Sequence, residues 1–262
     1  MEKLAGVFET KKKNGEIYYR SSLTYQGRHI SLQSFSDPMK AHLCYEEAQL
    51  CLKNKAITLE NYSPDYLPFE KLVCLLNVRD NQLYFSTPIY MRNKYFHYYF
   101  SKDDFLLFDL DDLFYYSRHK IMRRGGHLFV ADYGMQVNIL SRYGIKNYAV
   151  KGRDYLFING NESDYRYANI EIINRYHGVT RIEKNNRFYY KAAIHIVGNY
   201  LIGTYASETD AAIAYNKAVD IVHERGITKN YPVNFIDGMS PKTYAEIYSK
   251  LKVSEKLYQI SP

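Results

Sequence analysis

Tryptophan is absent from the 262 residues, and cysteine occurs only three times. Cys44, Cys51 and Cys74 are odd in number and include no CxxC pair, so the sequence supports neither a disulfide framework nor a zinc knuckle. We expect all three to be reduced and structural. Long apolar runs are also missing: Phe105–Phe108 is among the longest, far short of the roughly 20 residues that span a bilayer. The sequence therefore predicts no membrane span.

Two further kinds of signal are missing. Residues 1–6 contain no apolar segment followed by a small-residue cleavage site, so we expect an intracellular, cytoplasmic protein. No GxGxxG, P-loop or GxSxG motif occurs, which leaves a nucleotide-driven or acyl-transfer enzyme without support. We expect no cofactor and no metal site.

Basic charge and tyrosine are what the chain has in excess. Its 35 Lys and Arg residues outnumber its 28 Asp and Glu residues, so the formal charge is +7, and 46% of its residues are apolar, enough for real cores. The length predicts two domains, or three small ones. The 29 tyrosines have rings that can pack while their hydroxyls reach water or phosphate, although a genome rich in A and T would also favour tyrosine codons.

The two ends of the chain repeat one another. Residues of the first copy recur roughly 170 positions later, and the spacing changes by one residue at a turn. The matching pairs include Tyr19 and Tyr190, Leu23 and Ile194, Gly27 and Gly198, Leu32 and Ile202, Ala41 and Ala211, and Tyr45 and Tyr215.

Each copy has the pattern of three short strands followed by one helix. In the second copy, apolar residues alternate with others from Tyr190 to Ile196, as in a half-buried antiparallel strand. Ser207 is a good helix N-cap, and small and apolar residues then recur at three- and four-residue steps. In the first copy, Ser36 or Asp37 precedes a similar stripe. We expect each helix to cover the apolar face of its own sheet.

Several short signatures occur in the second copy in the order found in a known DNA-binding family. They are Gly178-Val179, Tyr190-Lys191-Ala192-Ala193-Ile194, Gly203-Thr204-Tyr205, Ala211-Ala212-Ile213-Ala214-Tyr215 and Val233-Asn234-Phe235. In these residues the copy resembles the APETALA-two/ethylene-response-factor domain, whose three-stranded sheet lies in the DNA major groove. The first copy departs from this pattern, since Ser34-Phe35 stands where Gly-Thr-aromatic is expected.

The resemblance implies that solvent-facing strand residues and the basic loops beside them contact DNA. Basic loops suit phosphates, and long polar side chains suit base edges. The candidate contacts are Lys12, Arg20, Thr24, Arg181, Lys184, Arg187, Lys191 and His195. Arg20 and His195 are the candidates for base recognition. The basic loops, 11–13 and 184–187, could equally be solvated turns.

The stretch 154–173 resembles the core of HNH homing endonucleases, in which Asp-His-Ile-Asn-Gly-Asn leads to Asn-Arg and then Asn-Leu. Here Ile158-Asn159-Gly160-Asn161 matches, but Leu156 occupies a metal-ligand position and Phe157 the general-base position. The structural Asn is retained as Asn169, and the distal ligand falls near Gly178, one residue from His177. A nuclease of this type needs the histidine base and a metal carboxylate, so the resemblance implies a degenerate site without nuclease activity.

Together these patterns predict an α+β protein in which two terminal modules, each a three-stranded antiparallel sheet with one helix, flank a degenerate HNH (ββα-metal-like) middle domain. The expected domains are 1–62, 63–175 and 176–262, with a further helix over 241–251. The expected function is that of a catalytically inactive, homing-endonuclease-like protein that binds double-stranded DNA, of the kind found in phages and mobile elements. The alternative is a protein-binding inhibitor of a host nucleic-acid enzyme or of an antiviral ribonucleoprotein of the CRISPR type, with tyrosine-rich surfaces as contact points.

Overall fold

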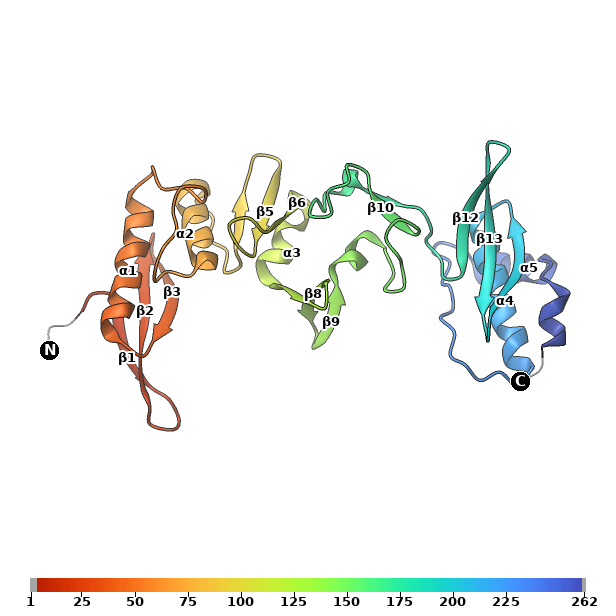
Figure 1. Cartoon of the computed structure of the whole chain (residues 1–262), viewed down its shortest axis with the longest axis horizontal. Coiled ribbons are helices and arrows are strands. Elements are labelled where there is room, and N and C mark those ends of the chain that lie inside the picture. Colours follow the sequence, from red (N-terminus) through yellow and green to blue (C-terminus); the bar gives the residue numbers. More distant parts are fainter. Residues whose placement is uncertain (1–3, 261–262) are drawn as a thin grey trace. The chain divides into compact units, whose positions relative to one another are not determined.

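The computed structural model describes residues 4–260 and shows a mixed α+β protein (Figure 1). The described chain contains five α-helices and several small three-stranded antiparallel sheets, so the expected α+β class is confirmed. Residues 1–3 and 261–262, which belong to the first and third expected domains, lie outside the described residues.

The chain divides into two compact units. One contains the residues up to 137 together with 161–167, and the other contains 138–160 together with the residues from 168 onward. Each unit has a hydrophobic cluster of its own. The three domains expected from the sequence stay a prediction.

In the first repeat, three strands form an antiparallel sheet in the order β1-β2-β3, and helix α1 lies along one face of it (Figure 1). The elements are β1 (Val7–Lys11), β2 (Ile17–Tyr25), β3 (Arg28–Phe35) and α1 (Pro38–Lys53). The Asp37 carboxylate accepts the Met39 N–H and caps α1. Buried small side chains, such as Ala41 and Ala48, let the helix approach the sheet closely.

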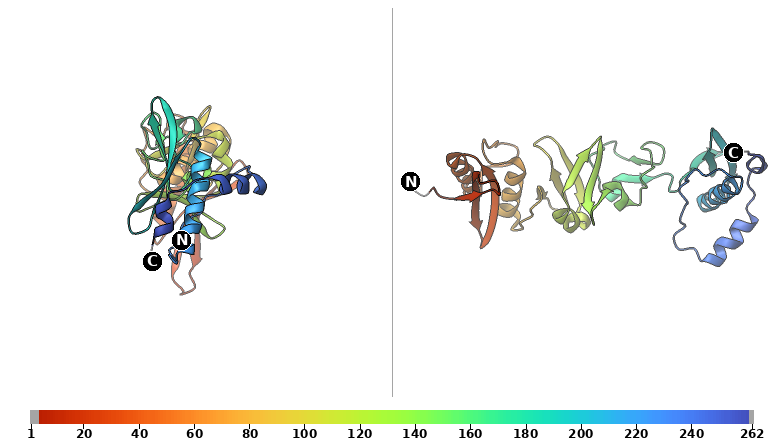
Figure 2. Two further views of the ribbon diagram at one scale, coloured as in Figure 1. Left: turned by 90° about the vertical axis from the view of Figure 1, so that its right-hand side faces the viewer. Right: turned by 90° about the horizontal axis from the view of Figure 1, so that it is seen from below.

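The second repeat has the same elements in the same order, and helix α4 covers its sheet (Figure 2). The elements are β12 (Val179–Lys184), β13 (Arg187–His195), β14 (Asn199–Tyr205) and α4 (Glu208–Glu224). The Ser207 hydroxyl accepts the Asp210 N–H, as an N-cap does. The expectation of three strands and one helix in each copy is confirmed.

The repeat extends to the strand register. Ser21 pairs with Gln33 and Ser22 with Ser31, which leaves one residue of β3, Leu32, unpaired as a β-bulge. In the second sheet the same irregularity leaves Ile202 of β14 unpaired, between the partners Ala192–Gly203 and Ala193–Leu201. Leu32 and Ile202 are both buried. A bulge re-aims side chains and increases twist, so both sheets bend at the same place to insert one extra apolar side chain into the core.

One close contact is also repeated. Gly6 and Gly178 have φ angles of +73° and +72° and stand directly before the first strand of each copy. A Cβ atom at Gly6 would collide with the Tyr45 ring, and a Cβ atom at Gly178 would collide with the Tyr215 ring. Only glycine satisfies both demands at these two positions.

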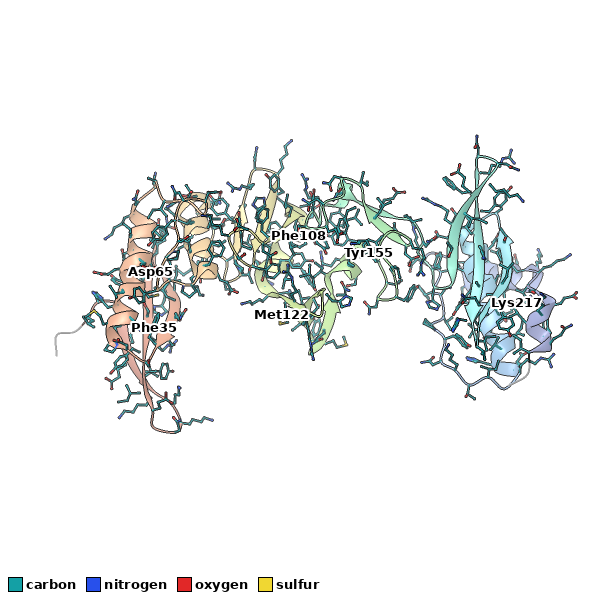
Figure 3. The ribbon with its side chains drawn as sticks, viewed as in Figure 1. Phe35, Asp65, Phe108, Met122, Tyr155 and Lys217 are labelled. Carbon is teal, nitrogen blue, oxygen red and sulfur yellow. The ribbon has the colours of Figure 1, made fainter. Side chains whose placement is uncertain are left out.

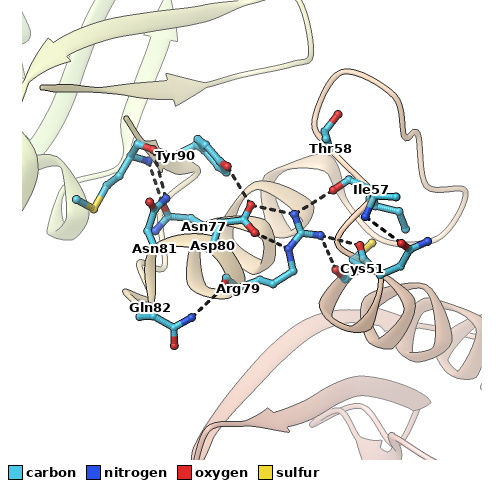
Figure 4. Close-up of polar contacts among 12 residues, drawn as sticks. Cys51, Ile57, Thr58, Asn77, Arg79, Asp80, Asn81, Gln82 and Tyr90 are labelled. Atoms are coloured by element: carbon cyan, nitrogen blue, oxygen red, sulfur yellow. Dashed lines mark hydrogen bonds and ion pairs between the residues drawn. The ribbon is translucent and has the colours of Figure 1, made fainter. Parts of the chain in front are cut away.

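Helix α2 (Phe69–Asn81) completes the core of the first repeat, because Leu72, Leu75 and Leu76 belong to the same cluster as residues of the sheet and α1. Its buried Arg79 holds the loop after α1: the guanidinium donates to the carbonyl oxygens of residues 51, 54 and 57 at 2.9, 3.0 and 3.0 Å (Figure 4). Asp80 accepts two further bonds from Arg79 and one from the Tyr90 hydroxyl.

The strands after α2 form two small sheets, and aromatic side chains are buried in this region. The first sheet consists of β4 (Ile89–Met91), β5 (Tyr95–Tyr99) and β6 (Phe105–Asp109), and the second of β7 (Ile121–Arg124), β8 (His127–Asp132) and β9 (Met135–Asn138). The short helices of the region are η1 (Leu110–Asp112), α3 (Leu113–Arg118) and η2 (Ile139–Tyr143). Phe108, labelled in Figure 3, is fully buried and its ring centroid lies 4.4 Å from that of Tyr116 and 5.4 Å from that of Phe96. Tyrosine here supplies core volume.

The expected C-terminal helix is confirmed as α5 (Pro241–Lys250), followed by η4 (Glu255–Gln259). Lys217 of α4, labelled in Figure 3, fixes the end of α5, since its ammonium donates to the carbonyl oxygens of Tyr248 and Leu251, both at 2.9 Å. Among the helices of residues 4–260, none combines the length and the apolar character that crossing a bilayer requires.

Candidate nucleic-acid interface

The face of each repeated sheet that is turned away from its helix is called here the outer face. On the second sheet it carries four of the predicted contacts, Lys184, Arg187, Lys191 and His195, all exposed. Lys184 pairs with Arg187 across the tight turn at 185–186, whose two asparagines have φ angles of +53° and +56°. Two cations therefore stand side by side at the tip of the hairpin, and two further nitrogen-bearing side chains follow along β13.

The first sheet places three predicted residues at the matching positions. Lys12 lies in the turn after β1, Arg20 pairs with Phe8, and Thr24 pairs with His29. All three predicted residues are exposed. Lys12 differs from its counterpart Lys184 in that its ammonium forms an ion pair with Glu16 at 3.0 Å, so its charge is partly neutralised.

Carboxylates are missing from both outer faces. The six strands of the two sheets contain two, Glu9 and Glu183. Glu9 pairs with Tyr19 and Glu183 with Phe188, and alternation puts both on the helix side of their sheets. The cations of the outer faces thus lie on surfaces without strand carboxylates.

Arg181 does not share the outer face. It alternates with Thr180 and Ile182, so its side chain lies on the helix side of the sheet. There the guanidinium stacks 4.7 Å from the Phe188 ring centroid and lies 3.6 Å from the Glu171 carboxylate. The structure therefore brings Lys184, Arg187, Lys191 and His195 together and separates Arg181 from them.

The HNH-like stretch contains a two-stranded hairpin of β10 (Tyr155–Phe157) and β11 (Ile170–Ile172), with the short turn η3 (Tyr167–Asn169) before β11. Asn169 is buried and closes the loop: its backbone carbonyl accepts the Ile158 N–H at 2.8 Å, and its side-chain oxygen accepts the Asn159 N–H at 2.9 Å. Leu156 and Phe157, at the expected ligand and base positions, are half-buried on β10.

A fixed ion pair precedes this hairpin. The buried Asp154 accepts bonds from the Arg153 guanidinium, from the Val150 N–H and from the Asn174 amide. Burial alone would raise the pKa of Asp154, but these hydrogen bonds outweigh it and hold the pKa below the ordinary value of an aspartate. Both oxygen atoms of this carboxylate are therefore engaged within the protein.

The chain passes from β11 to β12 through residues 173–178, which form no helix. His177 lies in this connection, with its ring centroid 4.6 Å from that of Tyr148 and 5.2 Å from that of Tyr215. Burial lowers the pKa of His177, and the positive charge of Arg153 lowers it further. Within residues 4–260, no three His, Cys, Asp or Glu side chains are grouped as they would be to hold a metal ion.

Three further residues of this region gave no signal in the sequence. Tyr148, Arg153 and Lys229 line a hollow above the outer face of the second sheet, beside Lys191 and His195. They come from loops before β10 and after α4, and no motif or periodicity connects such distant positions.

Comparison with known proteins adds no assignment: no family model, no curated protein and no solved structure matches the chain.

Proposed function

We propose that the protein binds double-stranded DNA through the outer faces of its two repeated sheets. The observation that carries this proposal is the distribution of charge: each outer face presents exposed cations, and the strand carboxylates of both sheets lie on the other side. A surface of this kind attracts a polyanion, because binding releases the counterions condensed on the phosphates.

The hairpin tip and the strand surface have separate roles in this proposal. Lys184 and Arg187 at the tip contact phosphates, which set the position of the protein on the duplex. Lys191, in the middle of β13, adds a third phosphate contact. Arg20, near the middle of β2, and His195, at the end of β13, contact base edges, where guanidinium and imidazole groups can donate hydrogen bonds.

The proposal extends to the whole chain. On the resemblance of its sequence, the protein is a catalytically inactive relative of the HNH homing endonucleases of phages and mobile elements, with a sheet-and-helix module at each end and a degenerate HNH domain between them. Leu156 and Phe157 can neither bind a metal nor accept a proton, so the duplex is bound and left uncut. Nicking of supercoiled plasmid with magnesium that disappears in an Asn169→Ala variant would contradict this.

The test is the salt dependence of binding. Replacing Lys184, Arg187 and Lys191 together by Ala removes three cations that neutralise phosphates, and the removal of each should reduce the slope of log K against log salt by about 0.9. We therefore expect weaker binding and a slope flatter by about 2.7 in a gel-shift titration on random duplex DNA. A Lys250→Ala, Lys252→Ala double variant on and after α5 is the matched control, and it should behave as the wild type does.

Unchanged binding in a folded triple variant would overturn the proposal in favour of a protein or ribonucleoprotein partner. Tyrosine is then a poor candidate for the contact surface, because only Tyr133, Tyr167 and Tyr258 among the 29 tyrosines are exposed. The others are buried or half-buried. A protein partner would have to use other apolar side chains, such as Phe8 and Leu201, which are 55% and 51% exposed.

A further inference from the structure

The outer face of the second sheet is the floor of a hollow of about 660 Å³. Lys191, Ala193 and His195 of β13 line it from below. One wall comes from the loop before β10, with Tyr148 and Arg153, and the other from residues 229–232 after α4. Pockets that bind small molecules have volumes of roughly 300–1,000 Å³, so the hollow has room for a ligand larger than a single ion.

The first wall is fixed by buried polar groups. The Asn174 amide donates to the backbone carbonyl of Arg153 at 2.6 Å and to the Asp154 carboxylate at 3.0 Å. The side-chain oxygen of Asn174 in turn accepts the Arg181 N–H of β12 at 2.6 Å. Because one buried side chain bonds to both the loop and the strand, the loop is held at the edge of the sheet.

The second wall is held by a pair of asparagine side chains. Asn234 and Asn216 of α4 exchange two hydrogen bonds, each 2.8 Å long, between side chain and backbone. The side chain of Asn234 also accepts the His177 N–H at 2.8 Å and donates to the His177 carbonyl at 3.0 Å. The segment that follows α4 is therefore tied to the helix and to the residues that enter β12. A site with both walls fixed loses little entropy when a ligand binds.

Aromatic rings line the inside of the hollow. His177 lies between Tyr148 and Tyr215, with the ring planes close to perpendicular to each other at 79° and 78°. Burial lowers the pKa of His177, which favours the neutral form of the imidazole. Rings of this kind can pack against a flat aromatic group of a ligand.

The rim of the hollow carries positive charge. Arg153 is paired with Asp154, but Lys191 and Lys229 form no ion pair with a carboxylate of the described residues. Lys229 donates to the carbonyl oxygen of His195 at 3.1 Å, which holds its ammonium beside the end of β13. The hydroxyl of Tyr231, on the same wall, is buried and has no hydrogen-bond partner within residues 4–260.

We propose that this hollow binds a nucleoside monophosphate, either free or at the 5′ end of a nucleic-acid strand. The phosphate lies between Lys191 and Lys229, and the base packs against Tyr148 and His177. Phosphate supplies the anion that the two ammonium groups attract, and the base supplies the flat ring that the aromatic lining accepts. The site goes beyond the proposed duplex binding, which also uses Lys184 and Arg187 outside the hollow.

The test is isothermal titration calorimetry of the full chain with AMP, GMP, CMP and UMP. Adenosine and inorganic phosphate are titrated separately, and a short single strand with a 5′ phosphate distinguishes a free nucleotide from a strand end. We expect at least one monophosphate to bind tenfold or more tightly than adenosine and phosphate do. Lys229→Met and Tyr148→Leu should each weaken that binding about tenfold, whereas the exposed Lys250→Met on α5 should leave it unchanged.

Absence of nucleotide binding to the wild-type chain at millimolar concentration would overturn the proposal. Equal affinity for inorganic phosphate and for AMP would overturn it too, because the aromatic lining would then contribute nothing. Lys229→Met and Tyr148→Leu change different walls of the hollow, so a folding defect in one variant does not decide the outcome. Circular dichroism checks that each variant is folded. A Lys184→Ala, Arg187→Ala double variant should lose duplex affinity and keep nucleotide affinity, so failure of one proposal is distinguishable from failure of the other.

Discussion

At position 178 the fold has room only for glycine, which has a hydrogen atom in place of a side chain. Its φ angle of +72° is unfavourable for any residue with a Cβ atom, and that atom would also meet the Tyr215 ring and the Ala193 carbonyl. We expect Gly178→Ala to lower the free energy of unfolding by about 2–4 kcal/mol, measured by urea denaturation.

Gly198→Ala is the matched control, because no atom lies within 4 Å of the Cβ position there and the backbone is not left-handed. It should leave the midpoint of denaturation almost unchanged. A Gly178→Ala variant as stable as Gly198→Ala would show that the tyrosine ring moves aside without cost.

His97 connects stability to pH. Burial lowers its pKa from 6.5 to about 4, and the charge of Arg92 adds to the effect. In the unfolded chain the imidazole takes up a proton near pH 6.5, whereas in the folded chain it stays neutral until about pH 4. Stability is therefore lost as the pH falls from about 6.5 to about 4. We expect the melting temperature to fall across this range.

The His97→Phe variant separates this residue from other acid-sensitive groups. Phenylalanine retains the stacking on Phe105, where the ring centroids are 4.6 Å apart, but loses the bond to the Tyr99 hydroxyl. We expect the variant to have a smaller drop in melting temperature between about pH 6.5 and about pH 4.5 than the wild type. An equal drop in both proteins would assign the acid sensitivity to other groups.

Among the elements, α2 completes the core of the first repeat, which residues 1–62 alone leave open. Eight consecutive residues of this helix, from Leu72 to Arg79, are buried, and five of them belong to the cluster that includes the sheet and α1, namely Leu72, Val73, Leu75, Leu76 and Val78. A fragment of residues 1–62 exposes that cluster and loses the bonds of Arg79 to the loop after α1. We expect it to melt without cooperativity by circular dichroism, and a fragment of residues 1–109 to melt cooperatively. Cooperative melting of 1–62 would contradict this.

The repeated elements are predictable because their sequence carries a period. Strand alternation and the small residues of α1 and α4 each follow one apolar face. The counterpart of α5 in the first repeat is harder to place. Ser63-Pro64 resembles Ser240-Pro241, but α5 begins at Pro241 whereas α2 begins at Phe69, five residues after Pro64. The Glu47 carboxylate accepts the N–H groups of residues 65, 66 and 67 and holds them in a loop, and a bond between positions so far apart leaves no local pattern.

The candidate interface is predictable to the same extent. Alternation along β13 places Lys191 and His195 correctly, and the turn places Lys184 and Arg187. The same alternation, applied to β12, puts Arg181 on the helix side. The walls of the hollow are not predictable, because the loops that carry Tyr148 and Lys229 are held in place by the long-range side-chain bonds of Asn174 and Asn234. Such bonds depend on tertiary structure alone.

Within residues 4–260, each of the two compact units has a hydrophobic cluster of its own, and the two clusters share no residue. We therefore expect calorimetry to show two unfolding transitions that respond to different substitutions. Gly178→Ala should lower the temperature of one. Leu75→Ala, in the fully buried part of α2, should lower the other, by the equivalent of about 2–5 kcal/mol. A single transition that moves in both variants would show that the two units unfold as one.

The shared bulge at Leu32 and Ile202 has a consequence for how this chain can change in evolution. The side of each sheet that packs against a helix is the same in register, bulge and glycine–tyrosine contact, whereas the outer side differs, with Phe8 in one copy where Thr180 stands in the other. In a repeated fold of this kind, both copies use the same packing between sheet and helix. Its two outer faces can then acquire new ligands independently, because substitutions there disturb no helix contact.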